Sequence, residues 1–485
     1  MHANDLADLE LTPAAMQNMG DLVLRHVVDH LASIAEQPVS GELDTAEQCR
    51  ALRESVPETG AALEPLVERL FSECIPRTHN TAGPGFLAYV PSGGVFTSAL
   101  ADLIASATNR YTGVWQAAPA LVQLEANTLD WLRDWMQFPA TTRGVFTTGG
   151  SAANFGGIVC ARERHLGADI RRGTMYVSSQ VHHSVTKSAR LAGVMADRVR
   201  AIGIDSAFRM RVDELARAIA RDRREGLQPF LVVSSAGTTN TGAVDPLAEI
   251  ADLARAEGLW HHIDGAYGAS FHLCPELRPL LAGLPRADSL TLDPHKGMFL
   301  PYGTGALLVA DGSVLKAAHS ATGSYMPQDH NQPDLYDPHQ FGPDLSRAFP
   351  GLRVWLTLKF YGAARYRAAL LEKRALALEA CERVAAIPHL VIDAVPQLSL
   401  FAFHVAWPGS TLAEQNTVTR ELLERVMRRG KVMLSGFETD GRFIARVCIL
   451  SHRTRRDRVE TCIEHLSQET DALVRSYTDR AGATI

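Results

Sequence analysis

The first part of the chain has the hydrophobic spacing of amphipathic helices. Thr12 and Pro13 form a helix start signal, with the threonine as N-cap and the proline at the first helical position. Apolar residues then recur at intervals of three and four, which places them on one helix face. These residues are Met19, Val23, Val27, Leu31 and Ile34.

A second amphipathic face lies within residues 57–74 and comprises Leu63, Leu66, Val67, Leu70 and Phe71. Two helices, at 13–36 and 57–74, cannot form a core alone when little strand signal surrounds them. We therefore expect both helices to pack against the body of the protein or against a second subunit.

At about residue 144 the pattern changes to strands that alternate with helices. Short apolar runs predict strands, and stretches such as 212–224 and 245–256 have the period of helices. Asp245 and Pro246 repeat the N-cap and first-position signature. This alternation is typical of an α/β fold with a mostly parallel sheet and helices on both faces. The predicted strands are 144–147, 174–178, 229–235, 258–263, 287–292 and 305–310.

After about residue 350, a helical stretch through Leu371 leads into shorter strands. These strands are expected near 397–405, 431–435 and 443–449, before a final helix that starts near Thr454. The sequence therefore predicts an N-terminal helical segment, a large α/β domain and a small C-terminal α+β domain. Their expected ranges are 1–85, 86–370 and 371–485.

Composition excludes several classes of protein. The 485 residues are 46 % hydrophobic and 21 % charged, so the chain can bury a large core and is not intrinsically disordered. With 48 Lys and Arg against 54 Asp and Glu, the net charge of −6 gives no basic surface for nucleic acid or an anionic membrane. No apolar run approaches the roughly 20 residues of a membrane-spanning helix. The first residues have neither the basic nor the apolar part of a signal peptide.

Cysteine usage indicates a reducing compartment. The seven cysteines are widely scattered and include no Cys-x-x-Cys pair, which argues against a disulfide framework and against a zinc site. We therefore expect a cytoplasmic protein with reduced thiols and no bound metal.

Four segments that follow predicted strands carry chemically useful groups. Lys296 ends an Asp-Pro-His-Lys run, Asp264 ends an apolar strand, and His182 follows another strand. The fourth segment is the small-residue turn 147–154, where free N–H groups at a helix start suit a phosphate. Each segment has an ordinary alternative: a solvated lysine, a helix-capping aspartate, a structural histidine and a tight strand-to-helix turn.

Together the four segments meet the requirements of pyridoxal 5'-phosphate. This cofactor needs a lysine for a Schiff base, an anion site for its phosphate, and an acid that keeps its pyridine nitrogen protonated. A flat imidazole can stack on its ring. The combination indicates a pyridoxal-phosphate enzyme.

The sequence resembles the pyridoxal-phosphate-dependent group II amino-acid decarboxylases, which include the aromatic-amino-acid, histidine and glutamate decarboxylases. The resemblance covers nearly the whole chain. Its most specific parts are His-Ile-Asp-Gly-Ala-Tyr at 262–267 and Asp-Pro-His-Lys at 293–296. Further matching segments are 86–91, 115–119, 124–125 and 446–447.

The resemblance implies a role for each site residue. Lys296 would hold the cofactor as a Schiff base, Asp264 would pair with the pyridine nitrogen, and His182 would stack on the ring. Thr239 would support the ring, and Ser151 and Ala152 would bind the phosphate. The other implied cofactor-binding residues are Gly150, Asp293 and His295.

The resemblance also implies a fold and an assembly. The family has the aspartate-aminotransferase fold (fold type I) and forms homodimers whose active sites lie at the subunit interface. Its N-terminal helices wrap around the partner, which would account for the uncovered faces expected at 13–36 and 57–74. Apart from this second subunit, the expected partner is a small-molecule amino acid.

An aromatic L-amino acid is the expected substrate, decarboxylated to its amine and carbon dioxide. If the family alignment holds, an apolar, ring-shaped pocket contains Phe86, Tyr89, Pro91, Trp115 and His182. No arginine is placed there to clamp an acidic side chain. Ser346 lies where plant aromatic-amino-acid decarboxylases vary between Gly and Ser.

Tyr325 is expected to donate the proton that completes decarboxylation. It lies in residues 319–347, a stretch without periodicity that has the character of a lid. In the family, a tyrosine here accompanies plain decarboxylation and a phenylalanine accompanies oxidative deamination. Tyr336 is the competing candidate, and both could be ordinary loop residues.

Two other kinds of function remain open. The same scaffold could decarboxylate glutamate, aspartate or diaminobutyrate, couple decarboxylation to oxidative deamination, or act as a transaminase or lyase. The chain could also be a non-catalytic dimeric relative, although such a protein has no need of Lys296, Asp264 and His182 together.

Overall fold

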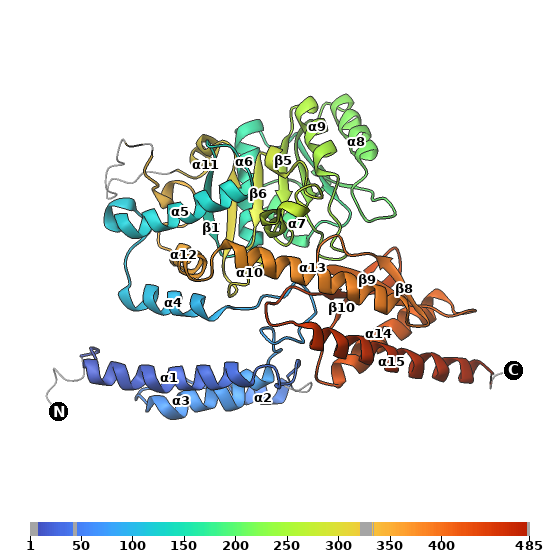
Figure 1. The fold of residues 1–485 in the computed structure, drawn as a ribbon. Coiled ribbons are helices and arrows are strands. Elements are labelled where there is room, and N and C mark those ends of the chain that lie inside the picture. The colour runs from blue at the N-terminus through green and yellow to red at the C-terminus, as the bar shows by residue number, and fades with distance from the viewer. Residues whose placement is uncertain (1–7, 42–45, 321–331, 333, 483–485) are drawn as a thin grey trace.

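A seven-stranded sheet forms the centre of the fold in this computed structural model, which describes residues 8–41, 46–320, 332 and 334–482 (Figure 1). The strand order is β1-β7-β6-β5-β4-β2-β3. β7 runs antiparallel to both of its neighbours, β1 and β6, and the other neighbouring strands are parallel, so the expected α/β class with a mostly parallel sheet is confirmed. The strands are β1 (Arg143–Thr147), β2 (Gly173–Ser178), β3 (Val199–Ile202), β4 (Gln228–Ser235), β5 (Trp260–Asp264), β6 (Ser289–Leu292) and β7 (Gly305–Val309).

Helices cover both faces of this sheet because its strands are apolar on both sides. On β2, Met175 and Val177 pack in the core with α6 and α7, whereas Tyr176 between them packs with α8 and α9. These helices are α6 (Gly150–His165), α7 (His183–Leu191), α8 (Val212–Arg224) and α9 (Leu247–Glu257). Other helices near the sheet are α5 (Pro119–Trp135), α10 (Pro294–Gly297), α11 (Gly312–His319) and α12 (Pro350–Tyr361).

A second, antiparallel sheet of order β10-β11-β9-β8 forms the C-terminal part with its own apolar core. Its strands are β8 (Leu390–Ala394), β9 (Leu400–Val405), β10 (Ser435–Thr439) and β11 (Arg442–Cys448). The helices packed with it are α13 (Ala363–Ala385), α14 (Leu412–Arg428) and α15 (Arg456–Gly482). The expected limit between the two domains, at residue 370, falls inside α13. The domain limits therefore stay a prediction.

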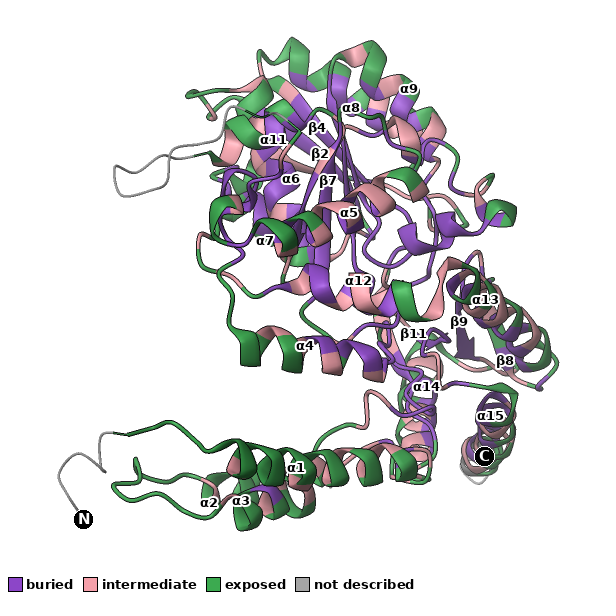
Figure 2. Cartoon of the chain, turned by 60° about the vertical axis from the view of Figure 1, so that its left-hand side comes forward, coloured by how far each residue is buried: buried purple, intermediate pink, exposed green. Residues whose placement is uncertain are grey.

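The N-terminal helices lie apart from both sheets and are largely exposed (Figure 2). They are α1 (Pro13–Ser33), α2 (Ala46–Ala51) and α3 (Leu63–Arg69), followed by α4 (Phe96–Thr108). The start signal of α1 is confirmed, because the Thr12 side chain accepts a hydrogen bond from the Ala15 N–H. No residue of α1 is buried, and Leu24 is 47 % exposed. Among the described helices, none has the length and apolar character needed to cross a membrane.

Several local expectations were wrong or incomplete. The strands β3 and β8 were not predicted, and each lies at the edge of its sheet. The strand expected near 431–435 instead runs over Ser435–Thr439 as β10. Asp245 does not cap α9, which begins at Leu247; its buried carboxylate instead accepts hydrogen bonds from the N–H groups of Met210 and Ser235, both at 2.7 Å. The carboxylate therefore joins the end of β4 to the segment before α8, and burial raises its pKa to about 6.

Candidate active site

The ends of several strands of the central sheet meet around a cavity of about 340 Å³. β2, β4, β5 and β6 are parallel, so their carboxyl ends lie at one edge, where open α/β sheets bind ligands. The cavity is lined by every residue that the sequence assigned to the cofactor. These are Gly150, Ser151, Ala152, His182, Thr239, Asp264, Asp293, His295 and Lys296.

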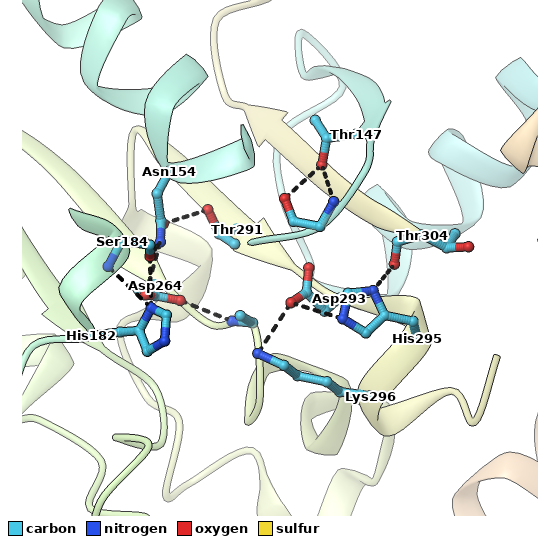
Figure 3. Close-up of polar contacts among 12 residues, drawn as sticks. Thr147, Asn154, His182, Ser184, Asp264, Thr291, Asp293, His295, Lys296 and Thr304 are labelled. Carbon is cyan, nitrogen blue, oxygen red and sulfur yellow. Dashed lines mark hydrogen bonds and ion pairs between the residues drawn. The ribbon is translucent and has the colours of Figure 1, made fainter. Parts of the chain in front are cut away.

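Lys296 lies on the short helix α10, directly after β6, and pairs with the residue that precedes this helix. Its Nζ atom is 3.1 Å from Oδ2 of Asp293 (Figure 3). The other oxygen of Asp293 is buried without a hydrogen-bond partner among the described residues. His295 points to the same carboxylate, with Nε2 3.6 Å from Oδ2, and its Nδ1 donates to the Thr304 carbonyl at 2.9 Å. Burial lowers the pKa of His295.

Asp264 ends β5 with its carboxylate held by two donors. The Asn154 amide donates to Oδ2 at 3.0 Å, and the Ala266 N–H donates to Oδ1 at 3.2 Å (Figure 3). The residue is only 8 % exposed, and no described Lys or Arg forms an ion pair with it. A carboxylate buried at a cavity without a protein cation is suited to a positively charged ligand group.

His182 is the N-cap of α7. Its Nδ1 accepts from the Ser184 N–H at 3.3 Å and lies 2.7 Å from the Ser184 hydroxyl. Burial is the main cause of its lowered pKa, so the ring is neutral near pH 7. Since Nδ1 accepts from an N–H group, the single proton of the neutral ring is on Nε2.

The turn between β1 and α6 approaches Asp293 closely. A Cβ atom at Gly150 would lie 2.9 Å from Oδ2 of Asp293 and 3.0 Å from Cβ of Ala266, so only glycine fits there. Gly149 has φ of 154°, which glycine adopts without strain. At the start of α6, the N–H groups of Gly150 and Ser151 have no partner among the described residues, whereas the Ala152 N–H donates to the Gly149 carbonyl at 3.0 Å. A phosphate group suits such free N–H groups at a helix start.

These observations fit pyridoxal 5'-phosphate. Lys296 offers an amine, the start of α6 offers N–H groups for a phosphate, and Asp264 is a carboxylate without a protein cation. Among the described residues, no cluster of three or more His, Cys, Asp or Glu side chains is arranged to hold a metal ion.

Arg446 on β11 places a buried positive charge beside this site. It is 3 % exposed, its Nε donates to the Ser435 hydroxyl at 2.9 Å, and its Nη1 donates to the carbonyl of Thr239, which lines the cavity. The charge of Arg446 also contributes to the lowered pKa of His182. No described carboxylate pairs with this guanidinium.

Apart from His182, the residues expected to contact the substrate do not line this cavity in the single chain. Phe86 is buried in a small core with Met433, Tyr89 is 57 % exposed, and the Trp115 N–H donates to Asp337 at 2.8 Å. Pro91 is buried and Ser346 is exposed. Their role in substrate binding stays a prediction.

Of the two candidate proton donors, the structure describes one. Tyr325 lies outside the described residues. Tyr336 is buried and stacks on Phe341 with 5.3 Å between ring centroids. It lines a separate cavity of about 260 Å³, with Arg133 and Leu308, rather than the cavity of Lys296.

Sequence reasoning missed four residues at or beside the site: Asn154, Ser184, Tyr302 and Arg446. Asn154 is a buried polar residue five positions into a helix that starts at the phosphate-type turn, which was an available signal. Ser184 follows His182 by two positions, and Tyr302 follows Lys296 by six. Arg446 stands in the buried part of β11, where charged residues are rare unless they are paired.

Comparison with known proteins supports the same chemistry. The pyridoxal-dependent decarboxylase conserved domain matches residues 46–406. The aromatic-L-amino-acid decarboxylase of Bacillus atrophaeus is 33 % identical, over 92 % of this chain and 94 % of its own. The phenylacetaldehyde synthase of Arabidopsis thaliana is 26 % identical, over 95 % of this chain and 96 % of its own.

A solved structure has the same fold. The crystal structure of Oryza sativa TDC with PLP and tryptamine superposes with a TM-score of 0.91 at 26 % identity. The match covers 96 % of this chain and 99 % of the Oryza chain. The fold is therefore that of pyridoxal-phosphate decarboxylases, fold type I, and the expected cofactor is confirmed.

Proposed function

The chain belongs to the pyridoxal-dependent decarboxylase family, and within it we propose that the chain decarboxylates an aromatic L-amino acid to the amine and carbon dioxide. The observation that carries this substrate class is the charge of the cavity. Among its described lining residues, Lys296 is the only Lys or Arg. The one guanidinium beside the cavity, that of Arg446, is assigned below to the carboxylate that every amino acid carries, so none is left for an acidic side chain. The similarity to an aromatic-L-amino-acid decarboxylase of Bacillus atrophaeus supports the same class.

Bound pyridoxal phosphate supplies an electron-withdrawing ring for the carbanion that remains when carbon dioxide leaves. In this proposal the residues of the chain hold and tune that ring. Lys296 is the attachment point, Asp264 holds the proton of the ring nitrogen, and His182 stacks on the ring with its proton on Nε2. Thr239 supports the ring, with Asp293 and His295 flanking Lys296. The phosphate lies at the start of α6, against Gly150, Ser151 and Ala152.

Arg446 is proposed to orient the substrate carboxylate. Its buried charge lies beside Thr239 and acts on His182, and no described carboxylate neutralises it. An anionic substrate group would remove the cost of leaving this charge without a counter-ion.

We also propose that two copies of the chain form a homodimer that completes the substrate pocket. The apolar face of α1 is uncovered, with Met19 36 % and Val23 38 % exposed. Tyr89, Ser346 and the lining residue Tyr302 are exposed in the single chain and would be covered at such an interface. Light scattering during size-exclusion chromatography should give twice the mass of the chain; a monomeric, fully active enzyme would contradict this arrangement. A cytoplasmic location remains part of the proposal.

A second candidate is decarboxylation coupled to oxidative deamination, which yields an aldehyde. The similarity to a phenylacetaldehyde synthase of Arabidopsis thaliana favours it. The two reactions differ in their products, since only the second consumes oxygen and releases ammonia and peroxide.

One assay separates these possibilities. The holoenzyme is incubated with tryptophan, tyrosine, phenylalanine, DOPA, histidine, glutamate, aspartate and diaminobutyrate, and carbon dioxide, amine, ammonia and peroxide are measured. The Lys296→Ala variant is the blank for each substrate. We expect amine and carbon dioxide in equal amounts from an aromatic amino acid. Turnover of glutamate or aspartate alone would overturn the aromatic assignment, and equal release of ammonia and peroxide would favour the second candidate.

A further inference from the structure

Asn154, on α6, stands at a junction of buried hydrogen bonds behind the candidate active site. One N–H of its amide donates to Oδ2 of Asp264 at 3.0 Å, and the other donates to the Ser184 hydroxyl at 3.2 Å. Its oxygen accepts from His262 Nε2 at 2.9 Å and from the Thr291 hydroxyl at 2.8 Å (Figure 3 shows the contacts with Ser184, Asp264 and Thr291). A primary amide has two donors and two acceptor lone pairs, so its capacity is fully used.

The orientation of this amide follows from its neighbours. A carboxylate only accepts hydrogen bonds, so the nitrogen of Asn154 must face Asp264. The reversed amide would place its oxygen against the carboxylate and leave two acceptors in contact. The residue is 1 % exposed, so water cannot relieve such a contact.

A chain of donors leads to this amide from the far side. The Trp260 indole N–H, which can only donate, is 2.7 Å from the Ser289 hydroxyl, and that hydroxyl is 2.7 Å from His262 Nδ1. Burial lowers the pKa of His262 to about 4, so the ring is neutral and carries one proton. With Nδ1 accepting, that proton is on Nε2 and is donated to Asn154.

The chain of hydrogen bonds therefore runs in one direction, from Trp260 through Ser289 and His262 to Asn154. There it branches. One branch ends on the Asp264 carboxylate. The other passes through the Ser184 hydroxyl, which accepts from Asn154 and donates to Nδ1 of His182 at 2.7 Å.

The backbone of β5, β6 and α6 leaves room for these hydrogen-bonded side chains. His262 and Asp264 are two residues apart on β5, so both side chains point to the face that α6 covers. Gly157, three residues after Asn154 on α6, makes room for the imidazole, since a Cβ atom there would lie 2.5 Å from Cε1 of His262. Thr291 comes from the neighbouring strand β6, directly opposite Asp264 in register.

We propose that Asn154 is a positioning residue that sets two cofactor contacts at once. It holds Asp264 as an acceptor facing the ring nitrogen, and through Ser184 it keeps the proton of His182 on Nε2. This inference rests on the roles proposed above for Asp264 and His182 and adds the residue that couples them.

The first test measures the cofactor rather than turnover. Apoenzyme is titrated with pyridoxal phosphate for its Kd, and isotope-labelled cofactor reports by NMR whether its ring nitrogen is protonated. Asn154→Ala should raise the Kd about 10- to 100-fold, the effect of losing a hydrogen bond to a charged group, and shift the nitrogen signal toward the unprotonated form. Asn154→Asp keeps the shape but not the donors and should not restore either property.

A milder pair of variants guards against misfolding. Thr291→Val removes one donor to Asn154 and no hydrogen bond of the Asp264 carboxylate, so we expect a smaller shift of the nitrogen signal in the same direction. Thr419→Val is the matched control, because Thr419 is equally buried and hydrogen-bonded but lies on α14 in the C-terminal part. It should leave the signal and the Kd unchanged.

The double variant Asn154→Ala, Asp264→Asn separates this inference from the proposed function. If Asn154 acts through Asp264, the double variant should bind cofactor within about threefold of Asp264→Asn alone, because coupled residues are not additive. Folded Asn154→Ala and Thr291→Val proteins with a wild-type nitrogen signal, or additive losses in the double variant, would overturn the inference. If Asp264→Asn itself leaves the nitrogen signal unchanged, the proposed role of Asp264 fails instead.

Discussion

The Nζ atom of Lys296 lies 3.1 Å from Oδ2 of Asp293, three residues earlier in the chain. The pair spans the start of α10, and the same Asp293 oxygen packs against the turn that precedes α6. One buried carboxylate therefore contacts both the lysine proposed to attach the cofactor and the turn proposed to hold its phosphate. This geometry leads to separate predictions for the two residues.

Replacing Lys296 with alanine should abolish turnover and the yellow absorbance of the cofactor without unfolding the protein. The side chain ends in the cavity, is 22 % exposed and supports no described contact other than that with Asp293. Borohydride reduction of wild-type enzyme followed by peptide mapping checks the assignment. A pyridoxyl group found on another lysine would refute it.

Asp293→Asn should bind pyridoxal phosphate and inorganic phosphate more tightly than wild type. The change removes a negative charge next to the start of α6, where the phosphate is proposed to lie, and we expect the Kd of both ligands to fall about threefold to tenfold, an effect near 1 kcal/mol. Isothermal titration of apoenzyme provides the measurement. Weaker phosphate binding would show that the carboxylate does not face the phosphate.

Arg446→Met should impair substrate binding more than cofactor binding. Loss of the buried charge beside Thr239 is expected to raise KM about 10- to 100-fold, while the Kd of pyridoxal phosphate changes little. Arg442→Met, at the start of the same strand, is the matched control and should behave as wild type. An unchanged KM in Arg446→Met would exclude the proposed contact with the substrate carboxylate.

Glu125→Gln should destabilise the fold by about 3–5 kcal/mol, the cost of breaking a buried ion pair. Glu125 is fully buried, pairs with Arg347 and accepts from the Gly351 N–H at 3.2 Å, so it fastens the segment before α12 to α5. Urea denaturation measures the loss. Glu424→Gln, which breaks an exposed pair with Arg428, should cost less than about 1 kcal/mol. Equal effects of the two changes would contradict the importance of burial.

Stability should fall as the pH drops below about 6.5, in part because of His261. Burial lowers its pKa to about 3 in the folded state, so between these values the unfolded chain binds a proton that the folded chain does not. His261→Gln removes this one-proton difference between the unfolded and folded states. It should therefore reduce the slope of unfolding free energy against pH by up to about 1.4 kcal/mol per pH unit. Denaturation curves from pH 7 to pH 4 test this. An unchanged slope would mean that His261 is not buried as a neutral ring.

The sequence alone determined the elements whose signals are local. The Thr12 cap and the apolar strands of the central sheet were predicted because cap residues and buried strands act within a few positions. Lys296, Asp264, His182 and the turn 147–154 were singled out from sequence because each ends or follows such a strand, and parallel strands end at one edge. The other candidate cofactor residues came from the family resemblance, and all of them line the same cavity. The edge strands β3 and β8 were missed, because each is short and has a single buried residue, so neither shows the pattern of a buried strand.

Only the tertiary structure decided which polar groups meet. Asn154 and Asp264 are 110 residues apart, and no spacing in the sequence indicates that an amide on a helix will bond the carboxylate of a strand. The same holds for Arg446 and Thr239, which are 207 residues apart. It also holds for Asp245, whose capping signature was overridden by backbone donors from the end of β4 and from the segment before α8. A buried polar group must be satisfied by whatever lies beside it after folding, so its partners depend on packing between distant segments rather than on local pattern.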